Sequence, residues 1–323
     1  MNGSFVPPAR AEKFVVAIDP PAAPSQLAKG VYAIGNFDGA HLGHAAVIAR
    51  SKKLAAELGA PAAALTFEPH PADFFAGQPV VFRLTSQPIK ARALEDLGLD
   101  GIVVLSFDGE LAGLTAEEFV RKILVERLDV RAVVVGWDFH FGKARGGSPR
   151  FLVEAGARHG FRVEVIEKVE AGSAGAPAIS STAIRRALES GDVKAAAKLL
   201  GRPYTIEGVV TAGQKLGRTL GIPTANIALP PTNRLAHGIY AVRVSVEGKC
   251  FDGVASFGTR PTVDNGAPLL EVFLFDFSGD LYGKTMEVAF EAYLRPELKF
   301  EGLEALKAQM EDDVVKAKAA LGR

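Results

Sequence analysis

The sequence predicts an α/β chain of two unlike domains, a first built on a parallel sheet and a second built on a small antiparallel β-barrel with a terminal helix. Three observations lead to this prediction. The chain has 323 residues, more than the length of about 250 to 300 residues at which single cores stop growing. Apolar runs alternate with helical stretches as far as Val169. After Ser180 two short helices, ending near Leu200, lead to closely spaced strands and turns beyond Pro203. The composition is 48% hydrophobic and 23% charged, which allows both halves to bury a core.

The apolar runs of the first half are short and rich in β-branched or aromatic residues, as in buried strands. They cover Val31–Phe37, Ala62–Phe67, Gly101–Phe107, Ala132–Trp137 and Phe161–Glu167. Helical stretches between them cover His44–Leu58, Gln87–Leu97, Thr115–Leu128 and Pro149–His159. Strands separated by helices predict a parallel sheet covered on both faces, whose ligands bind beyond the carboxyl ends of the strands.

The second half has the strand spacing of a barrel. The predicted strands cover Thr205–Ala212, a hairpin over Ile239–Ser256, Leu269–Phe277 and Thr285–Leu294, and one helix covers Gly302–Leu321. We place the first domain at residues 1–186, a helical linker at 187–202 and the barrel domain at 203–323. Because each domain would have its own core, we expect a fragment from about Gly191 to Arg323 to fold alone and keep its activity.

Charge and cysteine content favour small-molecule partners. Lys+Arg and Asp+Glu both number 37, so the chain has no basic excess for binding nucleic acid or an anionic membrane. A single cysteine, Cys250, excludes an internal disulfide and is typical of a reducing compartment. No apolar run has the length of a signal peptide core or of a membrane span. We therefore expect a cytoplasmic protein with no obligate protein partner.

The segment Gly35–His44, GNFDGAHLGH, connects the first predicted strand to the first predicted helix. Its glycines let the backbone approach a ligand closely, and the start of a helix offers N–H groups and a positive dipole end to an anion. His41 and His44 add donors that can follow charge on a phosphate. The spacing matches neither the dinucleotide fingerprint nor the Walker loop. The pattern predicts a phosphate site of another class; a plain glycine-rich turn and a zinc site are the alternatives.

A second cluster, Ile179–Arg186, begins a predicted helix with three hydroxyl groups and ends its first turn with two arginines. Hydroxyls cap helices and arginines bind phosphate, although an ordinary capped surface helix would look similar. Two loops that follow predicted strands, Glu68–Phe75 and Gly136–Gly142, mix aromatic and polar residues. A flat aromatic ligand could stack there, and plain core packing is the alternative.

The His-x-Gly-His turn resembles that of the nucleotidyltransferase superfamily. Four motifs in order, GNFDGAHLGH, TFEPHP, VGWDFHFG and ISSTAIR, resemble the FMN adenylyltransferase half of bacterial bifunctional FAD synthetases. The resemblance implies a nucleotidyltransferase-type domain that joins AMP from ATP to FMN. It implies catalytic roles for His41, His44 and Arg185, ATP-binding roles for Gly35, Asn36, Phe37, Asp38, Gly43, Ser181 and Thr182, and flavin-binding roles for Phe67, Pro69, His70, Asp138 and Phe139. Ala183 and His140 stand where the family commonly has arginine or another polar group.

The barrel half carries a second candidate phosphate site. A loop with spaced glycines and two cations contains Gly213, Lys215, Gly217, Arg218 and Gly221. Thr224 and Asn226, two apart in an extended segment, can face one way and hold Mg²⁺ or a phosphate oxygen, with a plain hairpin turn as the alternative.

Glu271 is a charged residue in the mostly apolar strand Leu269–Phe277, where it would share a face with Phe273, Phe275 and Phe277. A carboxylate in such a setting is a candidate general base, with an edge ion pair as the alternative. The segments GIPTAN, VASFGTRPT and LEVFLFDFSGDLYG resemble riboflavin kinase. That resemblance implies that Glu271 deprotonates riboflavin, that Thr224, Asn226 and Mg²⁺ orient ATP, and that Arg260 lies in the flavin site.

The combined interpretation is a bifunctional enzyme of flavin cofactor synthesis. The barrel would phosphorylate riboflavin to FMN, and the α/β domain would convert FMN and ATP to FAD and pyrophosphate, each with its own ATP and Mg²⁺. Three alternatives remain: a nucleotidyltransferase with another acceptor and an inactive flavin-binding second domain, a non-catalytic flavin-binding regulator, and a tRNA-acting relative. The last would need a basic surface that the charge balance does not provide.

Overall fold

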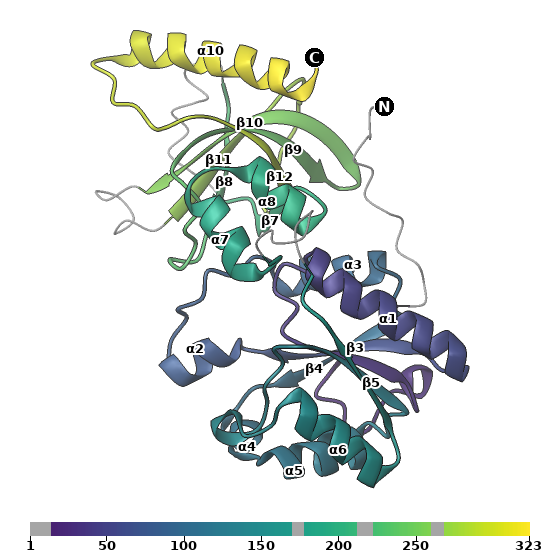
Figure 1. The fold of residues 1–323 in the computed structure, drawn as a ribbon. Helices are drawn as coiled ribbons and strands as arrows, with labels where there is room; N and C mark the ends of the chain where they lie inside the picture. Colours follow the sequence, from purple (N-terminus) through teal and green to yellow (C-terminus); the bar gives the residue numbers. More distant parts are fainter. Residues whose placement is uncertain (1–13, 170–177, 212–221, 260–267) are drawn as a thin grey trace. The chain divides into compact units, whose positions relative to one another are not determined.

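The computed structural model describes residues 14–169, 178–211, 222–259 and 268–323. The chain forms two compact units (Figure 1). The sheet unit contains the described residues up to Val81 and from Gln87 to Ser180, and the barrel unit contains Phe82–Ser86 and the described residues from Ser181 to Arg323. The domain boundaries at residues 186 and 202 stay a prediction.

The sheet unit is built on six parallel strands in the order β1-β4-β3-β2-β5-β6. The strands are β1 (Val15–Ile18), β2 (Val31–Ile34), β3 (Ala62–Glu68), β4 (Gly101–Ser106), β5 (Ala132–Gly136) and β6 (Arg162–Ile166). The helices are α1 (Leu42–Leu58), α2 (Pro71–Ala76), α3 (Gln87–Asp96), α4 (Gly109–Gly113), α5 (Ala116–Glu118), a π-helix (Phe119–Arg127) and α6 (Pro149–His159). The predicted parallel sheet is confirmed.

Alternate strand residues point to opposite cores, as period-two geometry requires. In β2, Val31 and Ala33 join the core under α1 and α3, whereas Tyr32 and Ile34 join the core under the π-helix and α6. All four are nearly inaccessible. Both faces of the sheet are therefore covered, and functional groups are left to the ends of the strands.

The barrel unit is an antiparallel sheet in the order β7-β12-β9-β10-β11-β8. Its strands are β7 (Tyr204–Val209), β8 (Ala225–Ala228), β9 (Gly238–Val246), β10 (Lys249–Thr259), β11 (Pro268–Leu274) and β12 (Thr285–Arg295). A bridge between Thr211 and Asn226 joins the two edges of the sheet, with the Thr211 N–H donating to the Asn226 carbonyl over 2.8 Å. This single bridge brings the two edge strands together at one point, so the sheet curls into a partly closed barrel.

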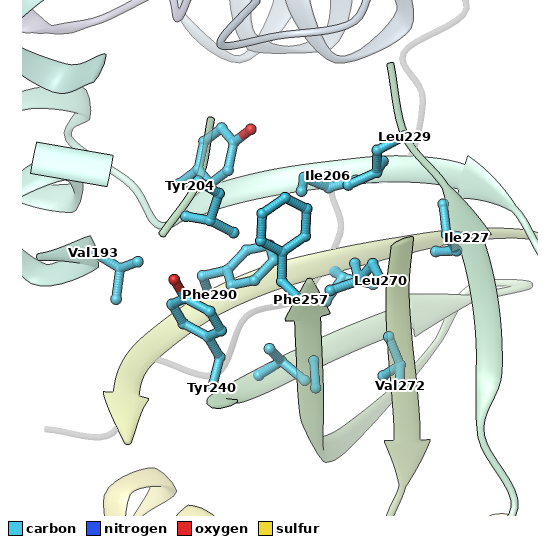
Figure 2. Close-up of a cluster of buried hydrophobic side chains, with 14 of the residues drawn as sticks. Val193, Tyr204, Ile206, Ile227, Leu229, Tyr240, Phe257, Leu270, Val272 and Phe290 are labelled. Atoms are coloured by element: carbon cyan, nitrogen blue, oxygen red, sulfur yellow. The ribbon is translucent and has the colours of Figure 1, made fainter. Parts of the chain in front are cut away.

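The interior of this barrel is aromatic and aliphatic. Figure 2 shows Tyr204, Phe257, Leu270 and Phe290, among others, pointing toward one another from different strands. Helices α7 (Ser181–Glu189) and α8 (Val193–Leu200) add to the same core. The barrel with a terminal helix that the sequence predicts is confirmed.

The terminal helix α10 (Leu303–Leu321) packs on the outer face of the barrel. Ala317 and Leu321 contact a second apolar cluster that includes Phe275. The guanidinium of Arg295 donates two hydrogen bonds to the Asp313 carboxylate, over 2.7 and 2.6 Å. Such a two-point contact fixes the helix in orientation as well as position. None of the described helices has the length and apolar character needed to cross a membrane.

Phe82–Ser86 belongs to the barrel unit although it precedes the barrel by about a hundred residues of sequence. Phe82 and Leu84 are 1% and 2% exposed and pack in the barrel core with Tyr204. The Arg185 Nε on α7 donates to the Phe82 carbonyl over 2.7 Å. A fragment beginning at Gly191 would lack Phe82 and Leu84, and also Ile184 and Leu188 of α7, from this core.

We expect Phe82→Ala to destabilise the barrel unit by about 3 to 5 kcal/mol, the usual cost of removing a buried phenyl ring. The measurement is the temperature at which each activity is lost when the same samples are heated. The kinase activity reports on the barrel unit and the adenylyltransferase activity on the sheet unit. Val80→Ala is the control, because Val80 is 46% exposed two residues away. An unchanged kinase inactivation temperature would show that Phe82 contributes little to this core.

Candidate active sites

The turn between β2 and α1 holds the backbone in strained conformations. Phe37 and Ala40 have φ angles of 48° and 39°, in the left-handed region that non-glycine residues seldom adopt, and Gly39 has a φ of 87°. Phe37 and Asp38 are 1% and 2% exposed, so their side chains are packed under the turn. Strain of this kind persists where packing enforces it, and it is enriched at functional sites.

His41 caps α1. Its Nδ1 accepts a hydrogen bond from the backbone N–H of His44 over 3.2 Å, so the proton of a neutral His41 ring lies on Nε2. The two imidazole rings stack with centroids 3.7 Å apart and an angle of 11° between their planes. The ring of Phe37 meets His44 edge-on at 5.2 Å. These contacts hold both predicted histidines in one place at the N-terminus of a 17-residue helix.

Gly43 is needed for this arrangement. A Cβ at Gly43 would lie 3.1 Å from the His41 ring and 3.2 Å from the Ile179 carbonyl, closer than ordinary contacts. The first turn of α1 contains no acidic residue that would repel an anion. The turn therefore combines a positive helix end, a ring donor and a short backbone approach, as a phosphate site requires.

Asn36 and His70 connect this turn to the end of β3. The Asn36 side-chain amide lies 3.3 Å from His70 Nε2, and the Asn36 carbonyl accepts from the Thr66 hydroxyl over 3.2 Å. His70 Nδ1 accepts from the Ala72 N–H at the start of α2, which places the His70 proton on Nε2. The Asn36 atom that faces His70 Nε2 is Nδ2, so this contact joins the turn to the loop after β3. Pro69 precedes His70 in a cis peptide with Glu68.

A chain of phenyl rings links the two aromatic loops that the sequence singled out. Centroid distances between neighbouring rings run from 5.2 to 6.3 Å along Phe74, Phe107, Phe67, Phe119, Phe141 and Phe139. Phe75 also contacts Phe107 and is 70% exposed, so it offers its ring to a ligand. Phe67, near the end of β3, and Phe139, in the loop after β5, thus belong to one aromatic cluster, in which Phe67, Phe119 and Phe141 are buried in the core.

In the second of these loops, Asp138 is exposed and Phe139 is half-buried. The Asp138 carbonyl lies 2.9 Å from His140 Nδ1, and Phe139 stacks on Phe141 at an angle of 17°. A Cβ at Gly136 would lie 3.2 Å from the Asp138 carboxylate, so the small residue lets the loop turn back closely. The loop presents one carboxylate and one ring beyond β5.

Ser181, Thr182 and Arg185 lie on the first turns of α7, in the barrel unit. Arg185, for which the sequence predicts a catalytic role, donates from its Nε to the Phe82 carbonyl.

The barrel brings Thr224, Asn226 and Glu271 together. Glu271 on β11 lies directly opposite Asn226 on β8, so both side chains are on the same face. The Asn226 side chain is 5% exposed, and its Nδ2 donates to the Thr224 carbonyl over 3.4 Å. Its Oδ1 is buried and has no hydrogen-bond partner among the described residues.

Glu271 is half-buried and its setting differs in part from the expectation. Leu270, Val272 and Leu274 point into the barrel, and Glu271 lies with Phe273 on the other face. The expected companion Phe277 does not share that face, because β11 ends at Leu274 and Phe277 packs against the barrel core. Asp276, with a φ of 57°, lies beyond the strand and binds Arg323.

Six sequence-predicted residues lie outside the described residues: Gly213, Lys215, Gly217, Arg218, Gly221 and Arg260. The sequence argument did not single out Phe107. It follows β4 directly, and the rule that ligands bind at the carboxyl ends of parallel strands would have indicated it. Within the described ranges, no three His, Cys, Asp or Glu side chains gather as they would around a metal ion.

Comparisons with known proteins match each half of the chain to a family. A family model described as FAD synthetase matches residues 23–183, and one described as riboflavin kinase matches residues 200–321. A bifunctional riboflavin kinase/FMN adenylyltransferase of Pseudomonas fluorescens is 44% identical over 90% of this chain and 92% of its own length. The protein of that name from Escherichia coli strain K12 is 40% identical over 90% of this chain and 93% of its own length.

A solved structure has the same fold. A Streptococcus pneumoniae protein titled macrolide-efflux protein matches with a TM-score of 0.78 and 30% identity, over 90% of this chain and 94% of that one. Together with the family models and relatives, this identifies the family of both halves of the chain. The chain belongs to the family of bifunctional riboflavin kinase/FMN adenylyltransferases, enzymes that make FMN and FAD.

Proposed function

We propose that the sheet unit transfers AMP at the β2–α1 turn. The phosphate oxygen of FMN attacks the α-phosphorus of ATP, the bond to the β-phosphate oxygen breaks, and pyrophosphate leaves. His41 Nε2–H and the His44 ring donate to the phosphate oxygens, where negative charge grows in the transition state. The observation that supports this most strongly is the stacked histidine pair at the N-terminus of α1. Gly35, Asn36, Phe37, Asp38 and Gly43 shape the same turn.

The flavin ring of FMN would stack on the accessible rings of this aromatic cluster. The half-buried Phe139 and the exposed Phe75 offer their rings, whereas Phe67 is buried and its flavin-binding role stays a prediction. His70, hydrogen-bonded to Asn36, and Asp138 offer polar contacts for ring edges, and Pro69 shapes the loop. The ATP-binding roles of Ser181, Thr182 and Arg185 stay predictions.

In the barrel unit we propose that Glu271 is the general base. It takes the proton of the riboflavin 5′-hydroxyl, whose oxygen attacks the γ-phosphorus of ATP while ADP leaves. The observation that supports it is the Asn226–Glu271 pair on one face, because it sets a carboxylate beside a cation ligand. The roles of Gly213, Lys215, Gly217, Arg218 and Gly221 toward ATP and of Arg260 toward flavin stay predictions.

The Asn226 amide fits Mg²⁺. An amide oxygen is a hard ligand of the type that this ion prefers, and the bond from Nδ2 to Thr224 directs Oδ1 away from the backbone. A buried oxygen without a hydrogen bond among the described residues gains from a cation. Bound there with the Thr224 hydroxyl, Mg²⁺ would neutralise phosphate charge, while Glu271 holds the proton removed from riboflavin.

We expect Asn226→Ala to raise the Mg²⁺ concentration for half-maximal kinase rate by about tenfold or more. FAD formation from supplied FMN should not change. The melting temperature should change little, because the substitution removes the buried Oδ1, which has no hydrogen bond among the described residues, together with one bond of 3.4 Å from Nδ2 to Thr224. Kinase assays over a Mg²⁺ series measure the effect, and an unchanged series would remove Asn226 from the metal site.

Incubation with riboflavin, ATP and Mg²⁺, followed by chromatography of the flavins, tests the whole proposal. Both FMN and FAD should form. FAD only from supplied FMN would favour an inactive second domain, and flavin binding with neither product would favour a regulator. We further propose that the enzyme works in the cytoplasm, where ATP is available.

A further inference from the structure

The outward face of the barrel carries one polar row across neighbouring strands. Thr211, Asn226, Glu271 and Ser256 lie side by side in that order, each directly opposite the next. Beyond Ser256 the row continues with the apolar Ile239 and then with Arg295, which binds α10. Directly opposed side chains have Cβ atoms about 4.5 to 5.5 Å apart. Ser256 is therefore a direct neighbour of Glu271 on one side, as Asn226 is on the other.

The order of this row matches the order of atoms in the reaction. In phosphoryl transfer the attacking oxygen lies between the phosphorus atom and the carbon chain that carries it. If Asn226 marks the side of the metal and the phosphate, and Glu271 contacts the attacking oxygen, the carbon chain of the acceptor extends toward Ser256. The next group that this chain offers is the hydroxyl on the neighbouring carbon.

Ser256 can bind such a group. Its side chain is half-buried, and its hydroxyl makes no hydrogen bond to another residue in the part of the chain that the structure describes. A serine hydroxyl both donates and accepts, which suits a partner that is itself a hydroxyl. We propose that Ser256 is a specificity-determining residue of the kinase that binds the ribityl 4′-hydroxyl of riboflavin. This inference rests on the proposed role of Glu271.

The test is analogous to a double-mutant cycle, in which one change is a substitution in the enzyme and the other is a group removed from the substrate. Parent and Ser256→Ala are each assayed with riboflavin and with an analogue that lacks the 4′-hydroxyl. The parent should lose about tenfold in kcat/KM with the analogue, the scale of one hydrogen bond. Ser256→Ala should lose about tenfold with riboflavin and show no further loss with the analogue. Flavin fluorescence titration without ATP should show the same pattern in Kd.

Two further variants make the cycle decisive. Ser256→Cys keeps the volume of the side chain, but its thiol hydrogen-bonds weakly. It should therefore show the same loss of about tenfold with riboflavin, and it replaces Ser256→Ala as the test if the alanine variant does not fold. Ser245→Ala is the matched control, since Ser245 lies on β9 on the same face but away from the row. The proposal would be overturned if parent and Ser256→Ala showed the same ratio of kcat/KM with riboflavin to kcat/KM with the analogue. It would also be overturned if Ser256→Ala kept the parental kcat/KM with riboflavin. Parental kinase activity in Glu271→Gln would instead overturn the role of Glu271.

Discussion

Glu271→Gln should lower the kcat of riboflavin phosphorylation by about 100 to 10,000-fold, the usual contribution of a general base. Glutamine keeps the volume and can still hydrogen-bond a hydroxyl, but it has no basic oxygen. The KM for riboflavin should therefore change little, and the variant should still convert supplied FMN to FAD. Steady-state kinetics of each half-reaction provide the measurement.

A structural role for Glu271 makes a different prediction. If the carboxylate only balanced a cation, its loss would lower the free energy of unfolding by about 3 to 5 kcal/mol. The melting temperature and the kinase rate would then fall together. Glu287→Gln is the matched control, because Glu287 is a half-buried outward-facing glutamate on β12. A folded Glu271→Gln enzyme with parental kcat would exclude the general-base role. Asp276 would be a poor replacement, since it lies beyond β11 and is bound to Arg323.

His44→Ala should lower FAD formation by about 100 to 1,000-fold and leave FMN formation unchanged. Losing one preformed donor to a transition-state charge has this scale. The substitution keeps the backbone N–H that His41 Nδ1 accepts, so the cap of α1 survives. It removes the stacked ring and its edge contact with Phe37. Assays with supplied FMN and with riboflavin separate the two activities.

His159→Ala is the matched control for this substitution, because His159 lies at the end of α6 and contacts Glu117. It should leave both activities at the parent level. Equal losses of FMN and FAD formation in His44→Ala would indicate a folding defect instead of a lost transition-state contact. Circular dichroism of the variant distinguishes a local loss from unfolding.

Much of the fold could be predicted from local pattern. The four central strands of the parallel sheet are mostly apolar and buried, and α6 has the predicted bounds, Pro149–His159, with Ser148 as its cap and Gly160 after it. The first strand, β1, was missed although its residues, VVAI, are all apolar, because it has only four residues. Helix α2 was missed because it has only six residues.

The candidate site of the sheet unit could be predicted because its residues lie in one segment. The candidate site of the barrel unit was harder to predict because its residues come from several strands. The segment from Gly35 to His44 contains turn, cap and both histidines, so its chemistry could be inferred from consecutive residues. The row of Asn226, Glu271 and Ser256 depends on strand register, which a single sequence does not specify. The alternation of Phe82 and Leu84 indicates buried side chains, but local pattern cannot tell which core receives them.

The position of Phe82–Ser86 in the chain also limits how such enzymes can be recombined. A single crossover that exchanged the barrel half for that of a relative would leave the resident Phe82 and Leu84 in a foreign core. Packing density in cores makes mismatched volumes costly. Functional chimaeras should therefore require two exchanged pieces, the barrel half from Ser181 onward and this five-residue segment, and natural exchanges of one half alone should select for compensating changes at these positions.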